Sequence, residues 1–277
     1  MPHLSSEPLV WHHPATWIPI LTNWLSPQLR VGAEGRLQLI DTEKWYDDDS
    51  EWTQLLASEL QTEFDDVKED LIDLLEHQIV RCYHGCRTED AGTYFREGLH
   101  FHRREKLEAR VRNLVESDAR LQWMLPKLAE RMAEFPSTVD EHRCFLVLDD
   151  RDMIDNAAHY LIYGSEWICS VLGYGFRAPL VEKGVPTIIE VDLPLSRTSP
   201  GLRRQLASLL LREWTRQFVR KPTEVLLQDF TFVLHEVLPA KFIMDHYHPL
   251  KMKDPLERGA LYRSPRETCL YCDESDV

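Results

Sequence analysis

The chain has 277 residues, of which 43% are hydrophobic and 28% are charged. This composition excludes a disordered or fibrous protein and allows a sizeable core. No apolar run of about eighteen residues occurs, which argues against a transmembrane helix, and six cysteines in so long a chain do not suggest a disulfide framework. The N-terminus lacks the pattern of a secretory signal, so we expect a cytoplasmic protein with no membrane partner.

The net charge of −14 is concentrated near the N-terminus. Residues 1–78 contain 16 acidic and 4 basic residues, whereas the remaining 199 residues contain 30 and 28. We therefore predict two domains, an acidic, Trp-rich helical extension over residues 1–78 and a near-neutral domain over residues 79–277. The acidic face of the extension is either simply solvated or a docking surface for a basic partner.

The hydrophobic pattern predicts an α+β fold. Helices are expected where apolar residues recur at helical spacing, and strands where short β-rich apolar runs occur. The two kinds alternate without a regular strand–helix–strand rhythm, which argues against a doubly wound sheet. In chain order the elements are a helix at 51–78, a strand at 79–86, helices at 88–98 and 105–134, a strand at 144–150, a helix at 157–173, a strand at 186–195, a helix at 201–219 and strand structure within 224–243.

A candidate binding motif lies in the segment YHGCRTEDAGTYFREGL, which begins at Tyr83. A strand that carries His84 next to Gly85 presents an imidazole beside exposed backbone groups, and that pair can hold a planar amide. Gly98 is a suitable residue to end the following helix. A histidine that ends a strand before a glycine turn explains the same residues without a ligand.

This segment resembles the first motif of the ADP-ribosyltransferase superfamily, which includes poly-ADP-ribose polymerases, diphtheria toxin and the DarT toxins. Members carry His-Gly-(Thr or Ser) on a strand, followed by a helix and a Gly-Leu pair. The resemblance covers roughly residues 79–243. It implies a split mixed or antiparallel sheet with flanking helices, and an enzyme that transfers ADP-ribose from NAD to a macromolecule.

The resemblance also implies roles for individual residues. His84 would position the adenosine ribose of NAD, Gly85 would hold the nicotinamide amide, and Tyr160 would stack on the nicotinamide ring. Three neighbours complete the expected NAD-binding set, namely Cys86, Arg87 and Tyr163. Two positions depart from the family, because Cys86 stands where Thr or Ser is usual and Ala157 stands where a serine precedes the tyrosine. Tyr160, Tyr163 and Trp167 also have the spacing of an ordinary core stripe.

The family places a glutamate at the start of a late strand, where it polarises the ribose and stabilises positive charge on the sugar. Two registers of QDFTFVLHEVLPAKFI fit this role. The spacing to the later Pro-containing element favours Asp229 (or Gln228), whereas the usual residue type favours Glu236. We rank Asp229 slightly ahead.

Histidine and cysteine pairs offer a competing interpretation. His100 and His102, and likewise His246 and His248, would each face one side of a strand, and Cys269 and Cys272 form a CxxC pair. Such residues suit zinc or iron in a metal-dependent hydrolase. Because only one CxxC occurs and surface histidines are common, we expect no metal site.

The resemblance implies partners as well as a reaction. The acceptor would be a protein or a nucleic acid, and an intracellular toxin or antiviral defence effector would suit the size of the chain. An antitoxin or regulatory protein could dock on the acidic N-terminal segment. Arg212, Arg216 and Arg220 form a helical stripe that either faces solvent or binds phosphates. A third possibility is a catalytically inactive binding module on the same fold.

Overall fold

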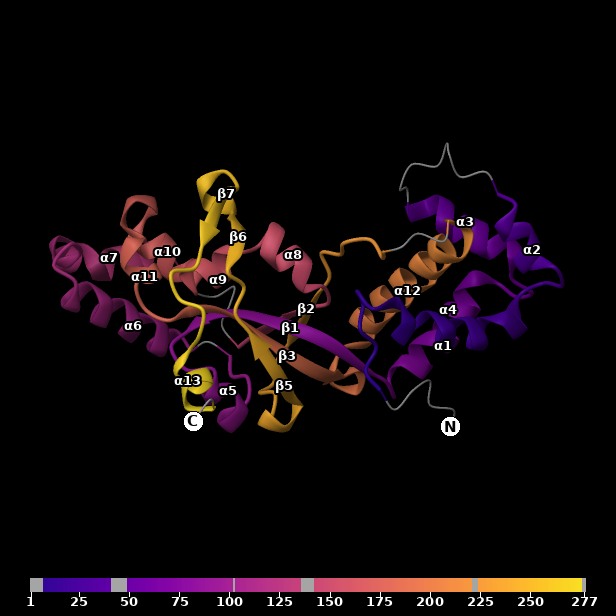
Figure 1. Ribbon diagram of the computed structural model, residues 1–277, viewed down its shortest axis with the longest axis horizontal. Coiled ribbons are helices and arrows are strands. Elements are labelled where there is room, and N and C mark those ends of the chain that lie inside the picture. The colour runs from indigo at the N-terminus through magenta and orange to yellow at the C-terminus, as the bar shows by residue number, and fades with distance from the viewer. Residues whose placement is uncertain (1–6, 41–48, 102, 136–141, 221–223, 276–277) are drawn as a thin grey trace. The chain divides into compact units, whose positions relative to one another are not determined.

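The computed structural model describes residues 7–40, 49–101, 103–135, 142–220 and 224–275. The chain is an α+β protein, as predicted, with a five-stranded antiparallel sheet and a small hairpin. It forms two compact units, Met1–Arg81 with Asp192–Gln228, and Cys82–Val191 with Asp229–Val277. These units differ from the predicted domains at residues 192–228, because the long helix in this segment buries its apolar face against the N-terminal helices (Figure 1).

The first unit is helical. Its α-helices are α1 (Ile18–Leu25), α2 (Ala33–Gln38), α3 (Asp49–Glu59), α4 (Phe64–Leu75) and α12 (Pro200–Arg220). Helix α12 packs against α3 and α4, and its Trp214 is fully buried and donates a hydrogen bond to the Thr22 hydroxyl, 2.8 Å away. The apolar spacing at 201–219 correctly predicted this helix.

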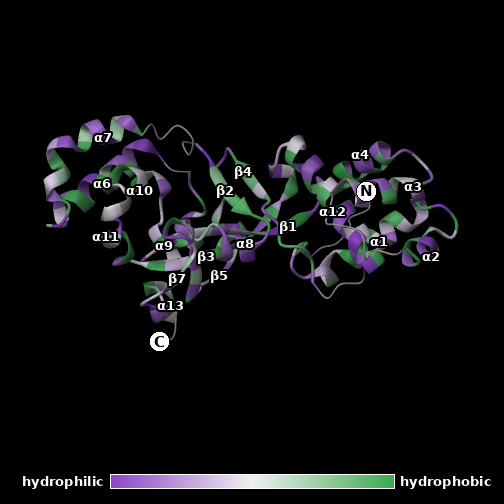
Figure 2. Ribbon diagram, turned by 90° about the horizontal axis from the view of Figure 1, so that it is seen from above, coloured by the Kyte–Doolittle hydropathy of each residue, from purple (hydrophilic) through white to green (hydrophobic). Residues whose placement is uncertain are grey.

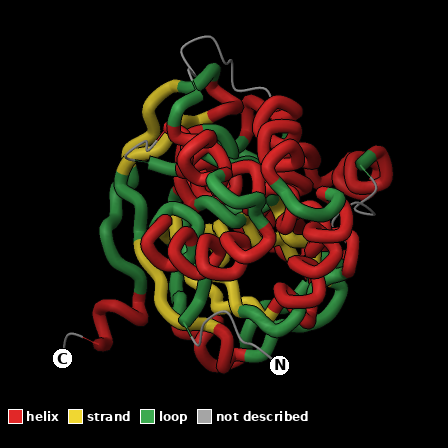
Figure 3. The backbone as a smooth tube through the Cα atoms, turned by 90° about the vertical axis from the view of Figure 1, so that its right-hand side faces the viewer, coloured by secondary structure: helices red, strands yellow, loops and turns green. Residues whose placement is uncertain are grey.

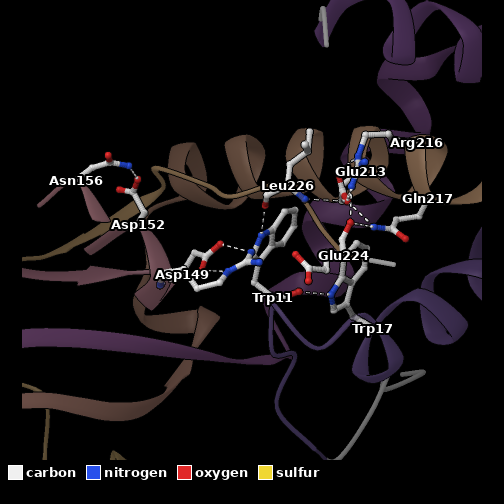
Figure 4. Close-up of polar contacts among 11 residues, drawn as sticks. Trp11, Trp17, Asp149, Asp152, Asn156, Glu213, Arg216, Gln217, Glu224 and Leu226 are labelled. Carbon is white, nitrogen blue, oxygen red and sulfur yellow. Dashed lines mark hydrogen bonds and ion pairs between the residues drawn. The ribbon is translucent and has the colours of Figure 1, made fainter. Parts of the chain in front are cut away.

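Three tryptophans of the acidic segment, Trp11, Trp17 and Trp52, are core residues. The indole rings of Trp11 and Trp17 stack with centroids 5.3 Å apart, and both are buried. Their ring nitrogens donate to backbone carbonyls, Trp17 to Trp11 at 3.1 Å and Trp11 to Leu226 at 2.9 Å (Figure 4). These rings therefore hold the N-terminal segment and the segment after α12 in one core.

An ion pair lies inside this unit. Glu213 and Arg216 on α12 are both almost fully buried, and two hydrogen bonds of 2.6 and 2.8 Å join them. Gln217 donates to the same carboxylate, and the Arg216 guanidinium also donates to the Glu224 carbonyl (Figure 4). The prediction that the arginine stripe faces solvent is wrong for Arg216, because Arg216 is buried in an ion pair with Glu213. Arg220 lies over the Trp52 ring, 4.9 Å from its centroid.

The second unit contains most of the sheet. The strands lie in the order β4-β2-β1-β3-β5, and β1 and β3 continue into the first unit. Tyr83 lies opposite Val147, which in turn lies opposite Thr231, so one register runs across three strands. Figure 2 colours most of β2 as hydrophobic. The strands are β1 (Ile79–Thr88), β2 (Cys144–Val147), β3 (Val185–Pro194), β4 (Thr231–Leu234), β5 (Ile243–Tyr247), β6 (Lys251–Asp254) and β7 (Ala260–Arg263).

Helices pack around this sheet; Figure 3 colours the helices of the whole chain red and the strands yellow. Helices α6, α9 and α10 contribute buried residues to the hydrophobic core that includes Tyr83 of β1 and Ile188 of β3. The helices of this unit are α5 (Gly92–Glu97), α6 (Arg104–Ser117), α7 (Leu128–Glu134), α8 (Asp150–Asp155), α9 (His159–Tyr163), α10 (Glu166–Leu172), α11 (Ala178–Val181) and α13 (Leu270–Ser275).

Three of the predicted helices are shorter than the periodicity suggested. The predicted helix 51–78 is broken where Leu60 pairs with Leu29, and the predicted helix 105–134 is interrupted after Ser117. The predicted helix 157–173 is broken at Gly164, whose φ of +85° lies in the left-handed region. Ser165 then caps α10 by accepting a hydrogen bond from the Ile168 amide.

The buried ion pair yields a stability prediction. Glu213→Ala leaves the Arg216 charge buried without its carboxylate, so the free energy of unfolding should fall by about 3–5 kcal/mol. Urea unfolding measures this change. The control is Glu69→Ala, which removes the exposed 2.9 Å pair with Arg204 and should cost less than about 1 kcal/mol. Equal losses in the two variants would contradict the importance assigned to the buried pair.

Candidate active site

His84 lies near the middle of β1, the central strand of the sheet. Its Nδ1 atom is 3.0 Å from the Phe145 carbonyl oxygen of the neighbouring strand β2. Because a carbonyl only accepts, Nδ1 carries the proton, and in the neutral ring Nε2 is then the acceptor. The Tyr94 ring of α5 packs beside the imidazole, with centroids 6.1 Å apart. Strand pairing thus fixes the orientation of this imidazole.

Gly85 points to the opposite face of β1 and is covered by side chains. A Cβ atom at this position would lie 2.1 Å from the Met153 sulfur and 3.2 Å from a methyl group of Leu161. These residues belong to α8 and α9, which follow β2. The space over Gly85, where the sequence analysis expected a nicotinamide ring, therefore holds Met153 and Leu161 in this conformation.

The side chains of Cys86 and Arg87 are both buried within the protein. Burial raises the pKa of the Cys86 thiol to about 12, so the thiol stays protonated at neutral pH and is a poor nucleophile. Arg87 is buried, and burial lowers the pKa of its guanidinium. That group donates hydrogen bonds to the carbonyls of Val181, Lys183 and Gly184. Arg87 thus holds the turn that precedes β3.

The two candidate tyrosines on α9 differ in their surroundings. Tyr163 is buried, donates to the Asp254 carboxylate at 2.5 Å and lies beneath the Arg177 guanidinium. Burial raises its pKa above the usual value, so it stays a neutral donor. Tyr160 is 38% exposed and its hydroxyl donates to Glu166 at 3.1 Å. Of these two tyrosines, Tyr160 has the ring that is accessible to a ligand.

The two candidate acids lie at opposite ends of β4. Asp229 precedes the strand and Glu236 follows it, and both are exposed. The Leu148 amide donates to the Phe230 carbonyl, so the chain next to Asp229 lies at the end of β2 where α8 begins. Glu236 lies at the other end, where Leu238 pairs with Leu99 after α5. The register therefore puts Asp229 at the α8 end of the sheet and Glu236 at the α5 end.

A cleft of about 880 Å³ lies beyond the C-terminal end of β1. Six residues of the predicted motif segment line it, together with one face of α6 and the turn before β3. Three of its lining residues are Lys106, Arg110 and Lys183, and none of them forms an ion pair with an acid among the residues that the structure describes. Two acidic residues, Glu89 and Asp90, also line the cleft, and Asp90 is paired with Arg96 at 2.7 Å.

The cleft has the size and charge of a site for a phosphorylated ligand. Its volume is within the usual range for small-molecule sites, and unpaired cations attract anions. Sequence reasoning missed this set, although one signal was present. Lys106, Arg110, Asn113 and Ser117 recur at helical spacing on α6, so they lie on one face of that helix.

The histidine and cysteine pairs separate into two groups. His100 is exposed and lies 3.1 Å from the Glu97 carbonyl oxygen, while His102 lies outside the described residues. By contrast, the second histidine pair and the CxxC pair come together, with ligand atoms within 4.8 Å of one another. We expected no metal site from the sequence, but the structure brings together four side chains that could ligate a metal ion.

Comparisons with protein-family models, with curated proteins and with solved structures found no match to this chain. Among the described residues, no helix combines the length and the apolar character needed to cross a bilayer.

The cleft yields a binding prediction. Lys106→Glu combined with Arg110→Glu converts two attractive charges into repulsive ones, so binding of inorganic pyrophosphate should weaken by about tenfold to a hundredfold. Isothermal titration at low salt measures this. Lys127→Glu, an exposed change outside the cleft, is the matched control. If pyrophosphate binds the double variant as tightly as the wild type, the cleft is not the anion site.

Proposed function

We propose that this protein transfers ADP-ribose from NAD to a macromolecular acceptor, using an ADP-ribosyltransferase-like site in the second unit. One observation carries the proposal. The three motif elements, at 79–88, 144–163 and 229–234, lie far apart in the sequence but belong to β1, to β2 with its following helices, and to the start of β4. These strands are neighbours in the sheet, in the order β4-β2-β1.

Local contacts support the same arrangement. Leu161 packs on Gly85, and Tyr160 is the adjacent residue of α9. Asp229 lies at the end of the sheet where α8 begins, whereas Glu236 lies at the far end. The imidazole of His84 is held by the Phe145 carbonyl. The proposed functional groups are the imidazole of His84 on one face of β1, the phenol of Tyr160 beside the residue that covers Gly85 on the other face, and Asp229 at the α8 end of the sheet.

The proposed chemistry is a displacement at the ribose carbon that bears nicotinamide. The bond between that carbon and the ring nitrogen breaks, and its electron pair leaves with neutral nicotinamide. Positive charge then develops on the sugar, and a nearby carboxylate stabilises it, most strongly where water is excluded. A nucleophilic atom of the acceptor forms the new bond and loses its proton to a base. Asp229 supplies the carboxylate, and His84 and Tyr160 position the two ends of NAD.

Two features extend this proposal. Met153 fills the nicotinamide position over Gly85, and methionine is unbranched and flexible. NAD binding therefore requires the Met153 side chain to rotate away. The cationic cleft beyond β1 supplies a second binding region for phosphate groups of NAD or of the acceptor. The acceptor is a protein or a nucleic acid, and the resemblance favours a toxin or defence effector.

One observation favours a second candidate, a binding module without catalysis on the same fold. Met153 and Leu161 occupy the Gly85 face as ordinary core residues, and both belong to the main hydrophobic cluster of this unit. In such a module this packing is permanent, and NAD is not turned over.

The histidine tests the proposed function directly. His84→Ala should reduce release of nicotinamide from NAD to background, because the ribose loses its positioning group, while the melting temperature stays close to that of the wild type. Chromatographic detection of nicotinamide measures turnover. The control His100→Ala changes an exposed histidine outside the site and should keep full activity. A wild-type protein that never consumes NAD supports the binding module, and full activity in His84→Ala removes His84 from the site.

The two acids provide a second test. Asp229→Asn should lower the turnover rate by about a hundredfold to a thousandfold, since it removes the charge that stabilises the sugar cation. Glu236→Gln makes the same change at the other end of β4 and should have a much smaller effect. Single-turnover kinetics with NAD compare the two variants. The reverse order would assign the catalytic role to Glu236.

A further inference from the structure

Four metal-ligating side chains converge beside the edge strand of the sheet. His246 lies on β5 and His248 directly after it, and β5 is the last strand in the sheet order. Cys269 directly precedes α13, and Cys272 lies in its first turn. The hairpin of β6 and β7 brings the two pairs together, because its ends meet where the Ser264 amide donates to the Leu250 carbonyl, 2.9 Å away.

We propose that these four side chains bind one zinc ion, as a structural Cys₂His₂ site. The alternation of a strand puts His246 and His248 on one face, and their rings lie 5.1 Å apart. The spacing of three residues puts both cysteines on one side of the helical turn. The proposal depends on this geometry alone and not on the function proposed above.

The separations between ligand atoms match a tetrahedron around zinc. Bonds of about 2.3 Å to sulfur and about 2.0 Å to nitrogen give edges of about 3.8 Å between two sulfurs and about 3.5 Å between sulfur and nitrogen. The two cysteine sulfurs are 3.9 Å apart. The Nε2 atoms of His246 and His248 lie 3.1 and 3.4 Å from the Cys272 sulfur, and the His246 nitrogen is 3.9 Å from the Cys269 sulfur.

The neighbours of His248 orient its metal-binding nitrogen. Its Nδ1 atom lies 3.1 Å from the Pro186 carbonyl oxygen, so Nδ1 carries the proton and donates. The lone pair of the neutral ring is then on Nε2, which faces Cys272. A backbone carbonyl that fixes the other ring nitrogen is the usual support for a zinc-bound histidine.

The chemistry of the donor set favours zinc. Two sulfurs and two imidazoles suit Zn²⁺ in a tetrahedron, whereas calcium and magnesium require oxygen ligands. Four protein ligands fill the coordination sphere and leave no position for a reacting water. The site is therefore structural, which argues against the metal-dependent hydrolase considered from the sequence.

The zinc ion would hold the C-terminal helix against the motif segment. Helix α13 lies beside α5 (Figure 1). The Tyr271 ring stacks on Phe95 of α5, with centroids 5.1 Å apart, and the Leu270 amide donates to the Glu89 carbonyl. A Cβ atom at Gly92 would lie 2.6 Å from the Tyr271 ring. Because a six-residue helix is not stable by itself, the metal would anchor α13 and, through it, one wall of the cationic cleft.

The test is metal analysis of the full chain, purified under reducing conditions and supplied with zinc before desalting. The wild type should retain about one zinc ion per chain, whereas Cys272→Ser and His246→Ala should retain almost none. The matched controls are Cys169→Ala and His100→Ala, which change residues outside the cluster and should keep the full zinc content. A wild type without zinc, or a Cys272→Ser variant with full zinc content, overturns the proposal.

A second measurement guards against variants that fail to fold. The wild-type chain loaded with Co²⁺ in place of zinc should absorb visible light strongly, as a tetrahedral site with thiolate ligands does, and added zinc should remove that absorption. A weak spectrum typical of octahedral cobalt with oxygen ligands would overturn the proposal even if no variant could be purified.

Discussion

The pairing of β1 with β2 controls the chemistry available to the second unit. It aligns Tyr83 with Val147 and brings the Phe145 carbonyl to the His84 ring. The same register continues into β4, so an acid that is 145 residues later in the sequence than His84 lies at an end of the same sheet. A slip of one residue would turn the imidazole to the opposite face of the sheet. Strand pairing therefore fixes His84 directly, and it fixes the end of the sheet at which Asp229 lies.

Much of this sheet could be predicted from the sequence. The apolar runs at 79–86, 144–150 and 186–195 correctly predicted β1, β2 and β3, and the apolar spacing at 201–219 predicted α12. The helix breaks were harder to predict. A single glycine within a helical pattern can lie inside a helix or end it, and the φ of +85° shows that Gly164 ends one. The helix predicted across Leu60 is broken because Leu60 pairs with Leu29, far away in the sequence. Periodicity reports which residues are apolar, but it does not report these local contacts.

The candidate sites were predicted less completely, for two physical reasons. The spacing of the arginines predicted that Arg216 faces solvent. In the structure Arg216 pairs with Glu213 on the same helix, and both side chains are buried. The zinc ligands looked unrelated because twenty residues separate His248 from Cys269, and only the β6–β7 hairpin brings them together. Spacing in the sequence does not show which face of α12 is buried, and it does not show which distant elements the fold brings together.

The central claim is that NAD binds along β1 at His84 and Gly85, with its nicotinamide ring over Gly85 beside Tyr160. A crystal of the protein soaked with NAD tests this most directly. The account predicts a nicotinamide ring over Gly85, the Met153 side chain rotated away, and Asp229 as the carboxylate nearest to the glycosidic carbon. A structure in which Met153 still covers Gly85, with NAD absent or bound elsewhere, would contradict it.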